Sequence, residues 1–175
     1  EEMLRAKVNV EALKKAKVFP FRLYTAYRAV ARDLERKDRK VLAYLADVMD
    51  EYSRSYDWSE FAEAKWVVAP DISGSMCSSI GASLVLTYAA VSAMFAGFFV
   101  KGLKDVTVLP WNRKVHRYTV SSEEPVMKHI DAITSMVEGG TYMEAGVKYM
   151  LANRIEADYS VFLTDTMEYG TGWLT

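Results

Sequence analysis

The chain has 175 residues, of which 51% are hydrophobic and 26% charged, and its formal net charge is −1. This composition is ordinary for a soluble globular protein, and the length is enough for one domain of medium size, or for one domain with a small satellite. Cys77 is the only cysteine, which excludes an intramolecular disulfide and agrees with a reducing, cytoplasmic location.

The first 56 residues are expected to be helical. Residues 10–16 form a short apolar and basic segment, and Pro20 suits the first turn of a helix because the N–H that it lacks would be unpaired there. Apolar residues recur at helical spacing over residues 21–34 and again over residues 41–52, behind a predicted N-cap at Asp38. Two helices joined by a short basic turn form an αα-hairpin, the unit of helical repeat proteins of the HEAT-like kind.

Strand-like and helix-like segments alternate in the second part. Composition changes near Tyr56, and residues 57–64 read as a connector. We expect strands at residues 66–69, 106–111, 114–120 and 159–163, and helices at residues 82–99, 124–136 and 142–152. The strand at 114–120 alternates polar and apolar residues, which is typical of an edge strand. The order of elements predicts an α/β fold with a doubly wound, mostly parallel sheet.

Residues 72–100 contain no charged side chain, so they are long enough to imitate a membrane span. Glycine, serine and threonine dilute the run, and no positive cluster precedes it. A helix buried on one face of a parallel sheet explains the same residues better, and we expect no membrane association.

The charge is distributed unevenly between these two parts. Residues 1–56 carry 13 Lys and Arg against 9 Asp and Glu, whereas residues 57–175 carry 9 against 14. A basic first part and an acidic second part indicate two surfaces with different partners. A chance difference of a few charges explains the same numbers equally well.

Oxygen-bearing side chains follow the ends of two predicted strands. Asp71, Ser73 and Ser75 come directly after the first strand, Asp165 follows the last, and Thr141 stands between a Gly-Gly turn and a helix. Doubly wound sheets bind ligands at the carboxyl ends of their strands, and Mg²⁺ prefers oxygen ligands. We therefore expect a divalent-cation site. The alternative is a serine-rich loop that binds phosphate or caps a helix without a metal.

This order of residues resembles the metal-ion-dependent adhesion site (MIDAS) of von Willebrand A domains, whose pattern is D-x-S-x-S, then a threonine, then an aspartate. The resemblance implies that the hydroxyls of Ser73, Ser75 and Thr141 contact Mg²⁺ or Mn²⁺, and that Asp71 and Asp165 act directly or through water. An ion held largely by neutral hydroxyls would attract a carboxylate or phosphate from outside.

A narrower resemblance covers nearly the whole chain. The strings KVFPFR at residues 17–22 and YTAY at residues 24–27, the D-x-S-G-S-M loop, and the Thr164-Asp165-x-x-Glu168 ending resemble the TROVE family, to which Ro proteins belong. Ro proteins have a ring of helical repeats followed by an A domain. The resemblance implies that residues 1–56 are the C-terminal end of the ring, that 57–64 are the connector, and that 65–175 are an incomplete A domain. We therefore expect the chain to be a piece of a longer protein.

Ro proteins bind small noncoding RNAs and the single-stranded ends of misfolded RNA, so the resemblance implies an RNA-binding ribonucleoprotein component. Six basic side chains are candidates for contacts with phosphates, with a solvated helix face as the alternative: Arg22, Arg28, Arg32, Lys37, Arg39 and Lys40. Tyr24 and Tyr27 are of a type that stacks on bases, although core positions explain them better.

A second function class remains open beside RNA binding. The metal site would also suit a protein-binding A module that holds an acidic side chain of a partner within a larger assembly, and the two functions can coexist in one chain. An enzyme is not expected, because the sequence has no G-x-S-x-G, P-loop or H-E-x-x-H motif. Its two histidines, His116 and His129, fall in a predicted strand and a predicted helix, where surface or core positions explain them.

Overall fold

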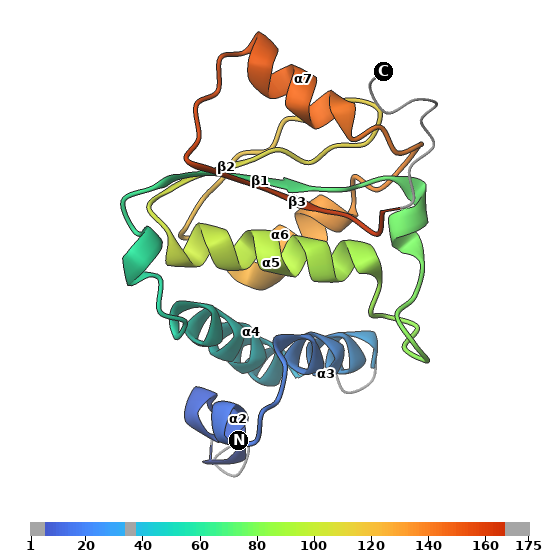
Figure 1. The fold of residues 1–175 in the computed structure, drawn as a ribbon. Coiled ribbons are helices and arrows are strands. Elements are labelled where there is room, and N and C mark those ends of the chain that lie inside the picture. The colour runs from blue at the N-terminus through green and yellow to red at the C-terminus, as the bar shows by residue number, and fades with distance from the viewer. Residues whose placement is uncertain (1–5, 34–37, 167–175) are drawn as a thin grey trace.

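The computed structural model describes residues 6–33 and 38–166, which fold into stacked layers of helices and one sheet (Figure 1). The first part contains the helices α2 (Val10–Lys15), α3 (Pro20–Arg32) and α4 (Arg39–Arg54). Pro20 begins α3, and the Asp38 carboxylate caps α4 by accepting hydrogen bonds from the N–H groups of Lys40 and Val41. The predicted helical hairpin is therefore confirmed.

The sheet contains three parallel strands in the order β2-β1-β3, with β1 (Lys65–Pro70) in the centre. β2 spans Asp105–Val108 and β3 spans Tyr159–Leu163. Five of the six residues of β1 are buried, as expected for a strand that is paired on both sides and covered on both faces. The prediction of a parallel α/β sheet is confirmed.

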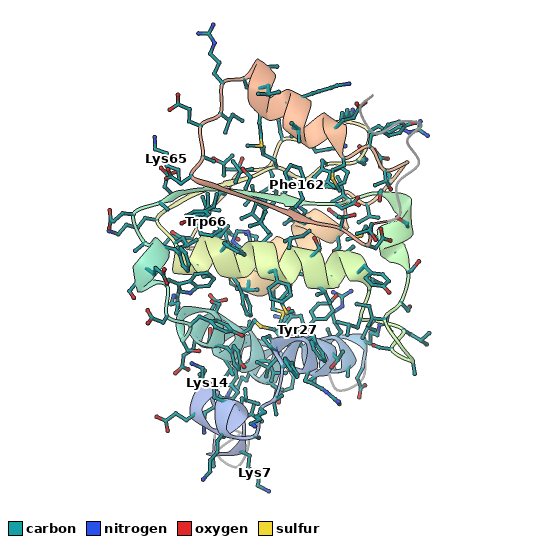
Figure 2. All side chains as sticks on the ribbon, viewed as in Figure 1. Lys7, Lys14, Tyr27, Lys65, Trp66 and Phe162 are labelled. Carbon is teal, nitrogen blue, oxygen red and sulfur yellow. The ribbon has the colours of Figure 1, made fainter. Side chains whose placement is uncertain are left out.

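Helices cover both faces of this sheet (Figure 1). On one face lie α5 (Tyr88–Gly102) and α6 (Val126–Thr134), and on the other lies α7 (Glu144–Ala152). Alternate residues of β1 serve the two sides: Val68 belongs to the core under α5 and α6, whereas Val67 and Ala69 belong to the smaller core under α7. Figure 2 shows Phe162 of β3 on the side of α7, where it packs against the smaller core.

Two predicted elements differ from the structure. The helix expected from residue 82 begins at Tyr88, because Thr87 caps it and residues 78–87 form a turn in which the Ser83 hydroxyl accepts from the N–H of Leu86. The strand expected at 114–120 is wrong. That segment, which the structure describes in full, contains only an isolated bridge from Val115 to Trp111. The polar and apolar residues of this segment alternate because Val115 packs on the smaller core, whereas Tyr118 and Val120 pack on the larger one.

The helical hairpin packs directly on α5 and α6, so the larger core runs without interruption from the first helices to the sheet. A buried ion pair joins these layers. The Lys101 ammonium of α5 lies 2.8 Å from an Asp50 carboxylate oxygen of α4, and their side chains are 1% and 13% exposed. Asp50 also accepts from the N–H of Val126 at the start of α6, and Lys101 donates to the carbonyl of Ser122. Four segments therefore meet at one charge pair.

The connector between the two parts is packed as well. It contains one turn of 3-10 helix, η1 (Ser59–Phe61), and the indole N–H of Trp58 donates to the carbonyl of Ser53. The Trp58 ring lies against Phe99 of α5, in a space that exists because residue 102 is glycine. Across residues 6–33 and 38–166, no helix has the length and apolar content needed to cross a membrane.

Candidate metal centre

The candidate residues gather where β1 and β3 end. Pro70 pairs with Leu163 in the parallel register, and the N–H of Asp71 then donates to the carbonyl of Leu163 at 2.9 Å. Because parallel strands end at the same edge, Asp71 and Asp165 leave the sheet side by side. The sequence prediction that these two strand ends meet is confirmed.

The Asp71 carboxylate is fully buried and is held through both of its oxygens. Oδ1 accepts from the N–H of Ser73 at 2.8 Å, and Oδ2 accepts from the Thr164 hydroxyl at 2.7 Å. Each carboxylate oxygen has a second lone pair, so these bonds fix the direction of the group while leaving it able to accept from a bound ion or an ion-bound water.

The two serine hydroxyls lie beside this carboxylate. Ser73 Oγ is 3.2 Å from Ser75 Oγ, and Ser75 Oγ donates to Asp165 Oδ1 at 3.4 Å. Mg²⁺ binds oxygen at about 2.0–2.1 Å in an octahedron, which places neighbouring ligand oxygens about 2.9 Å apart. The spacing of the two hydroxyls is close to that value, so these side chains fit two neighbouring positions around one such ion.

Gly74 allows the loop with Thr141 to approach these serines. The N–H of Gly74 donates to the carbonyl of Gly139 at 2.8 Å, and a Cβ on Gly74 would lie 3.2 Å from that oxygen. Gly139 has a φ of +73°, which favours glycine. Thr141 follows two residues later and is 2% exposed. Side-chain contacts therefore join four of the five predicted residues, and a backbone contact between loops brings the segment of Thr141 beside them.

Asn112 is a residue that the sequence reasoning missed. It is 4% exposed, and its amide nitrogen donates to the carbonyl of Glu138 at 2.9 Å. Its backbone carbonyl accepts from the N–H of Tyr142 at 3.2 Å, so Asn112 holds the loop on both sides of Thr141. The amide oxygen lies 3.0 Å from His116 Nε2, which further orients the group. A single polar residue in a turn carries no sequence signal for this role.

The composition of the site decides which metal it suits. Among the described residues, no group of three or more His, Cys, Asp and Glu side chains could hold an ion. The donors that do gather are hydroxyls and two carboxylates, all of them hard oxygen ligands. Such donors suit Mg²⁺ or Mn²⁺, whereas zinc sites use histidine and cysteine.

The candidate RNA contacts are spread over α3 and the start of α4. Arg28 forms a 3.0 Å ion pair with Asp131 of α6 and lies over the ring of Tyr24, so it connects layers of the fold. Tyr24 is 5% exposed, which agrees with the interpretation as core, and Tyr27 packs at the edge of the same core. Lys37 lies outside the described residues. The remaining four side chains of the set are exposed: Arg22, Arg32, Arg39 and Lys40.

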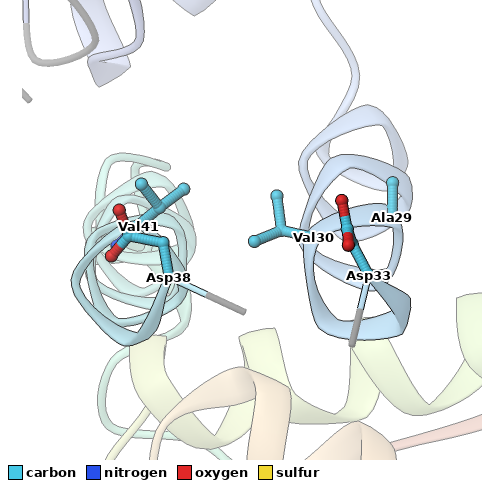
Figure 3. Close-up of a pocket in the computed structure, with 5 residues that line it drawn as sticks. All are labelled: Ala29, Val30, Asp33, Asp38 and Val41. Atoms are coloured by element: carbon cyan, nitrogen blue, oxygen red, sulfur yellow. The ribbon is translucent and has the colours of Figure 1, made fainter. Parts of the chain in front are cut away.

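A hollow lies between the end of α3 and the start of α4 (Figure 3). Ala29, Val30 and Val41 line it together with the carboxylates of Asp33 and Asp38. Two negative groups disfavour a phosphate there.

His129 has a structural role. It is 2% exposed, and its Nε2–H donates to the carbonyl of Ser121 at 3.0 Å, while Nδ1 accepts from the Tyr118 hydroxyl. Both ring nitrogens are thus satisfied by the neutral imidazole. Burial lowers the pKa of His129 and raises the pKa of Tyr118 to about 12, so the pair stays neutral near pH 7.

Comparisons with known proteins agree with the α/β fold of the second part of the chain. Residues 65–172 match the family described as "Ro60 vWA domain". The chain is also similar to the crystal structure of the RO (RSR) protein of Deinococcus radiodurans, with a TM-score of 0.65 and 15% sequence identity. That alignment covers 93% of this chain and 34% of the other, so this chain spans about a third of the length of that protein. No curated protein sequence matches the chain.

Proposed function

Because the chain belongs to the family of the Ro60 von Willebrand A domain, we propose that it is part of a Ro-type ribonucleoprotein component and that its A domain binds Mg²⁺ or Mn²⁺. In this proposal residues 1–56 are the end of a helical-repeat ring, residues 57–64 are the connector, and residues 65–175 are the A domain. The RNA partner is a small noncoding RNA or the single-stranded end of a misfolded one, and the location is cytoplasmic.

One observation carries the metal-binding half of the proposal. The hydroxyls of Ser73 and Ser75 lie 3.2 Å apart, and that of Ser75 also donates to Asp165. In the same loop both carboxylate oxygens of the buried Asp71 are held by hydrogen bonds. In the proposed site Ser73, Ser75 and Thr141 contact the ion, and Asp71 and Asp165 act directly or through water. The ion would supply positive charge at the edge of the sheet and a coordination position for an outside oxygen.

A metal titration tests this half. Mn²⁺ binding, followed by the loss of the free-ion electron paramagnetic resonance signal, should be stoichiometric for the natural chain and strongly weakened in Ser75→Ala. Mg²⁺ should compete with Mn²⁺ and raise the melting temperature, because a ligand that binds only the folded state stabilises it. Asp71→Ala removes a buried carboxylate, so its Mn²⁺ affinity is interpreted only if circular dichroism shows that the variant folds. A Ser75→Ala protein with unchanged Mn²⁺ affinity would contradict the assignment.

The RNA-binding half is supported by the family match and by the charge of the first part. Residues 1–56 have four more basic than acidic side chains, 13 against 9, and several basic side chains of α3 and α4 are exposed. Phosphate contacts of this kind give affinity that falls steeply with salt.

Filter binding of single-stranded RNA over a salt series tests the RNA proposal. The combined variant with alanine at residues 22, 32, 39 and 40 should reduce both the affinity and the salt slope. Alanine at Lys65, Lys104, Lys128 and Lys148, four exposed lysines of the other part of the chain, is the matched control. An absence of RNA binding at low salt in the protein with its complete ring would overturn the proposal.

A protein-binding A module within a larger assembly, without RNA binding, is the second candidate. The observation that favours it is the small number of protein donors around the ion, which leaves room for a carboxylate from a partner. Mg²⁺-dependent binding of an acidic protein partner by a chain that fails the RNA test would select this candidate.

A further inference from the structure

We propose that Phe19 and Phe21 form a platform on which one unpaired base of a single-stranded RNA stacks, while basic side chains near Phe19 contact the phosphates beside that base. The inference rests on the proposed RNA binding. It adds the part of the RNA that is recognised, an unpaired base, and two aromatic residues outside the set of basic contacts.

The rings of Phe19 and Phe21 are stacked on each other. Their centroids are 5.5 Å apart, and their planes differ by 6°. Phe21 packs against the larger core and so holds the pair in place, whereas Phe19 is 64% exposed. One ring face of Phe19 therefore lies open, parallel to an anchored ring behind it. A flat base can continue such a stack.

The backbone fixes where the Phe19 ring lies. Phe19 precedes Pro20, which disfavours helical backbone at this position, and it is extended with φ −71° and ψ 147°. Its carbonyl accepts from the N–H of Arg22 in the first turn of α3 at 2.9 Å. Lys17 has a φ of +52° in the turn between α2 and α3. The platform is preformed, so a base can stack on it without a rearrangement of the chain.

The charge near the platform favours a nucleic acid as the occupant. Residues 12–32 contain six basic side chains and no acidic one: Lys14, Lys15, Lys17, Arg22, Arg28 and Arg32. Two of the six have partners elsewhere in the fold. Lys15, Lys17 and Arg22 lie within four residues of Phe19 and are exposed. Contacts of such side chains with phosphates give affinity without a choice of sequence, and an aromatic ring stacks on every kind of base.

The place of the platform in the fold keeps it accessible. α2 and the segment that leads from it to α3 lie at the end of the molecule away from the sheet (Figure 1). Tyr24 of α3 has a ring of the type that stacks on bases, but it is 5% exposed and therefore closed to a ligand. A stacking contact with RNA at the start of this helix falls on Phe19.

Anisotropy titrations of a short labelled oligouridylate, in which no base is paired, test the inference with the protein that has its complete ring. Phe19→Leu keeps an apolar side chain and loses the ring, so it should weaken binding about fivefold or more at every salt concentration. The slope of log affinity against log salt should stay unchanged, because no phosphate contact is lost. Phe19→Trp, which keeps a flat ring, should bind as tightly as the natural chain. Neither variant should change the affinity for a fully paired RNA duplex.

Phe95→Leu is the matched control, because Phe95 of α5 is also exposed, at 42%, and lies in the other part of the chain. Equal affinities of the natural chain, Phe19→Leu and Phe95→Leu would overturn the platform and leave the RNA proposal standing. A loss in Phe19→Leu with a reduced salt slope would also overturn it, since the variant would then act through the phosphate contacts. A natural protein that binds no RNA at low salt would overturn the RNA proposal, and the platform with it. A dimer of the natural chain that Phe19→Leu dissociates, at unchanged RNA affinity, would assign the rings to a contact between two copies.

Discussion

Replacement of Asp50 by alanine should lower the free energy of unfolding far more than replacement of an exposed charged residue. In Asp50→Ala the Lys101 ammonium, whose side chain is 1% exposed, would keep the Ser122 carbonyl as its only partner among the residues that the structure describes. The N–H of Val126 would also lose its acceptor at the start of α6. Breaking a buried ion pair on one side costs about 3–5 kcal/mol, because the remaining charge is buried without compensation.

Urea unfolding at pH 7, followed by circular dichroism, measures this cost. With a slope of about 1–3 kcal/mol per molar urea, a loss of 3 kcal/mol lowers the midpoint by about 1–3 M. Arg28→Ala is the matched control, since the Arg28–Asp131 pair joins the same layers with side chains that are 35% and 53% exposed. Its cost should be about 0.2–1 kcal/mol.

A second variant separates the charge from the packing. Asp50→Leu combined with Lys101→Met removes both charges and keeps apolar volume, so it should be close to neutral or even stabilising. If Asp50→Ala costs no more than the Arg28→Ala control, the ion pair is not the buried contact described here. If the double variant costs as much as the single one, the loss arises from packing or from the unpaired N–H of Val126, and the uncompensated charge of Lys101 is not its cause.

Three further predictions concern the site, the buried histidine and the connector. Asn112→Ala should lower Mn²⁺ affinity by about 10–100-fold, as other residues that orient metal ligands do, whereas alanine at the neighbouring exposed Lys114 should leave it unchanged. Because burial lowers the pKa of His129 below the ordinary 6.5, the unfolded chain binds more protons and stability should fall as pH drops below 6.5. His129→Gln should flatten that dependence in urea titrations between pH 5 and 8, and an unchanged slope would assign it to other groups. Gly102→Ala would place a Cβ 2.2 Å from Trp58 Nε1, so it should cost about 1–3 kcal/mol by displacing the ring, and a melting temperature equal to that of the natural chain would refute this.

The strands and the ends that carry the candidate ligands were predictable because their signals are local. β1 and β3 are short apolar segments, and Asp71 and Asp165 follow them directly, so topology alone brings them to one edge. The strand expected at 114–120 failed for a physical reason. Alternating burial also arises when a loop divides its side chains between two cores, as Val115 and Tyr118 do.

The residues that hold the site together were not predictable for a different reason. Asn112 acts through bonds to residues that lie 26 and 30 positions later in the chain, and nothing in its own segment points to them. The start of α5 was misplaced because the uncharged run conceals a turn, in which Gly81 has a φ of +62°. Apolar content indicates that a segment is buried, whereas a polar cap such as Thr87 determines where its helix begins.

The packing of the connector bears on whether the two proposed functions act together. Trp58 is wedged against Phe99 and Gly102 of α5, and Asp50 ties α4 to the same helix through Lys101. At its other end α5 reaches the candidate site, where the Ser92 hydroxyl donates to the carbonyl of Leu163, two residues before Asp165. A helix anchored at both ends holds the basic hairpin and the cation site in a fixed relation, because packed interfaces shift between discrete arrangements and do not deform gradually. An RNA on the hairpin and a ligand at the cation site would therefore bind without either requiring a rearrangement of the packed layers between them.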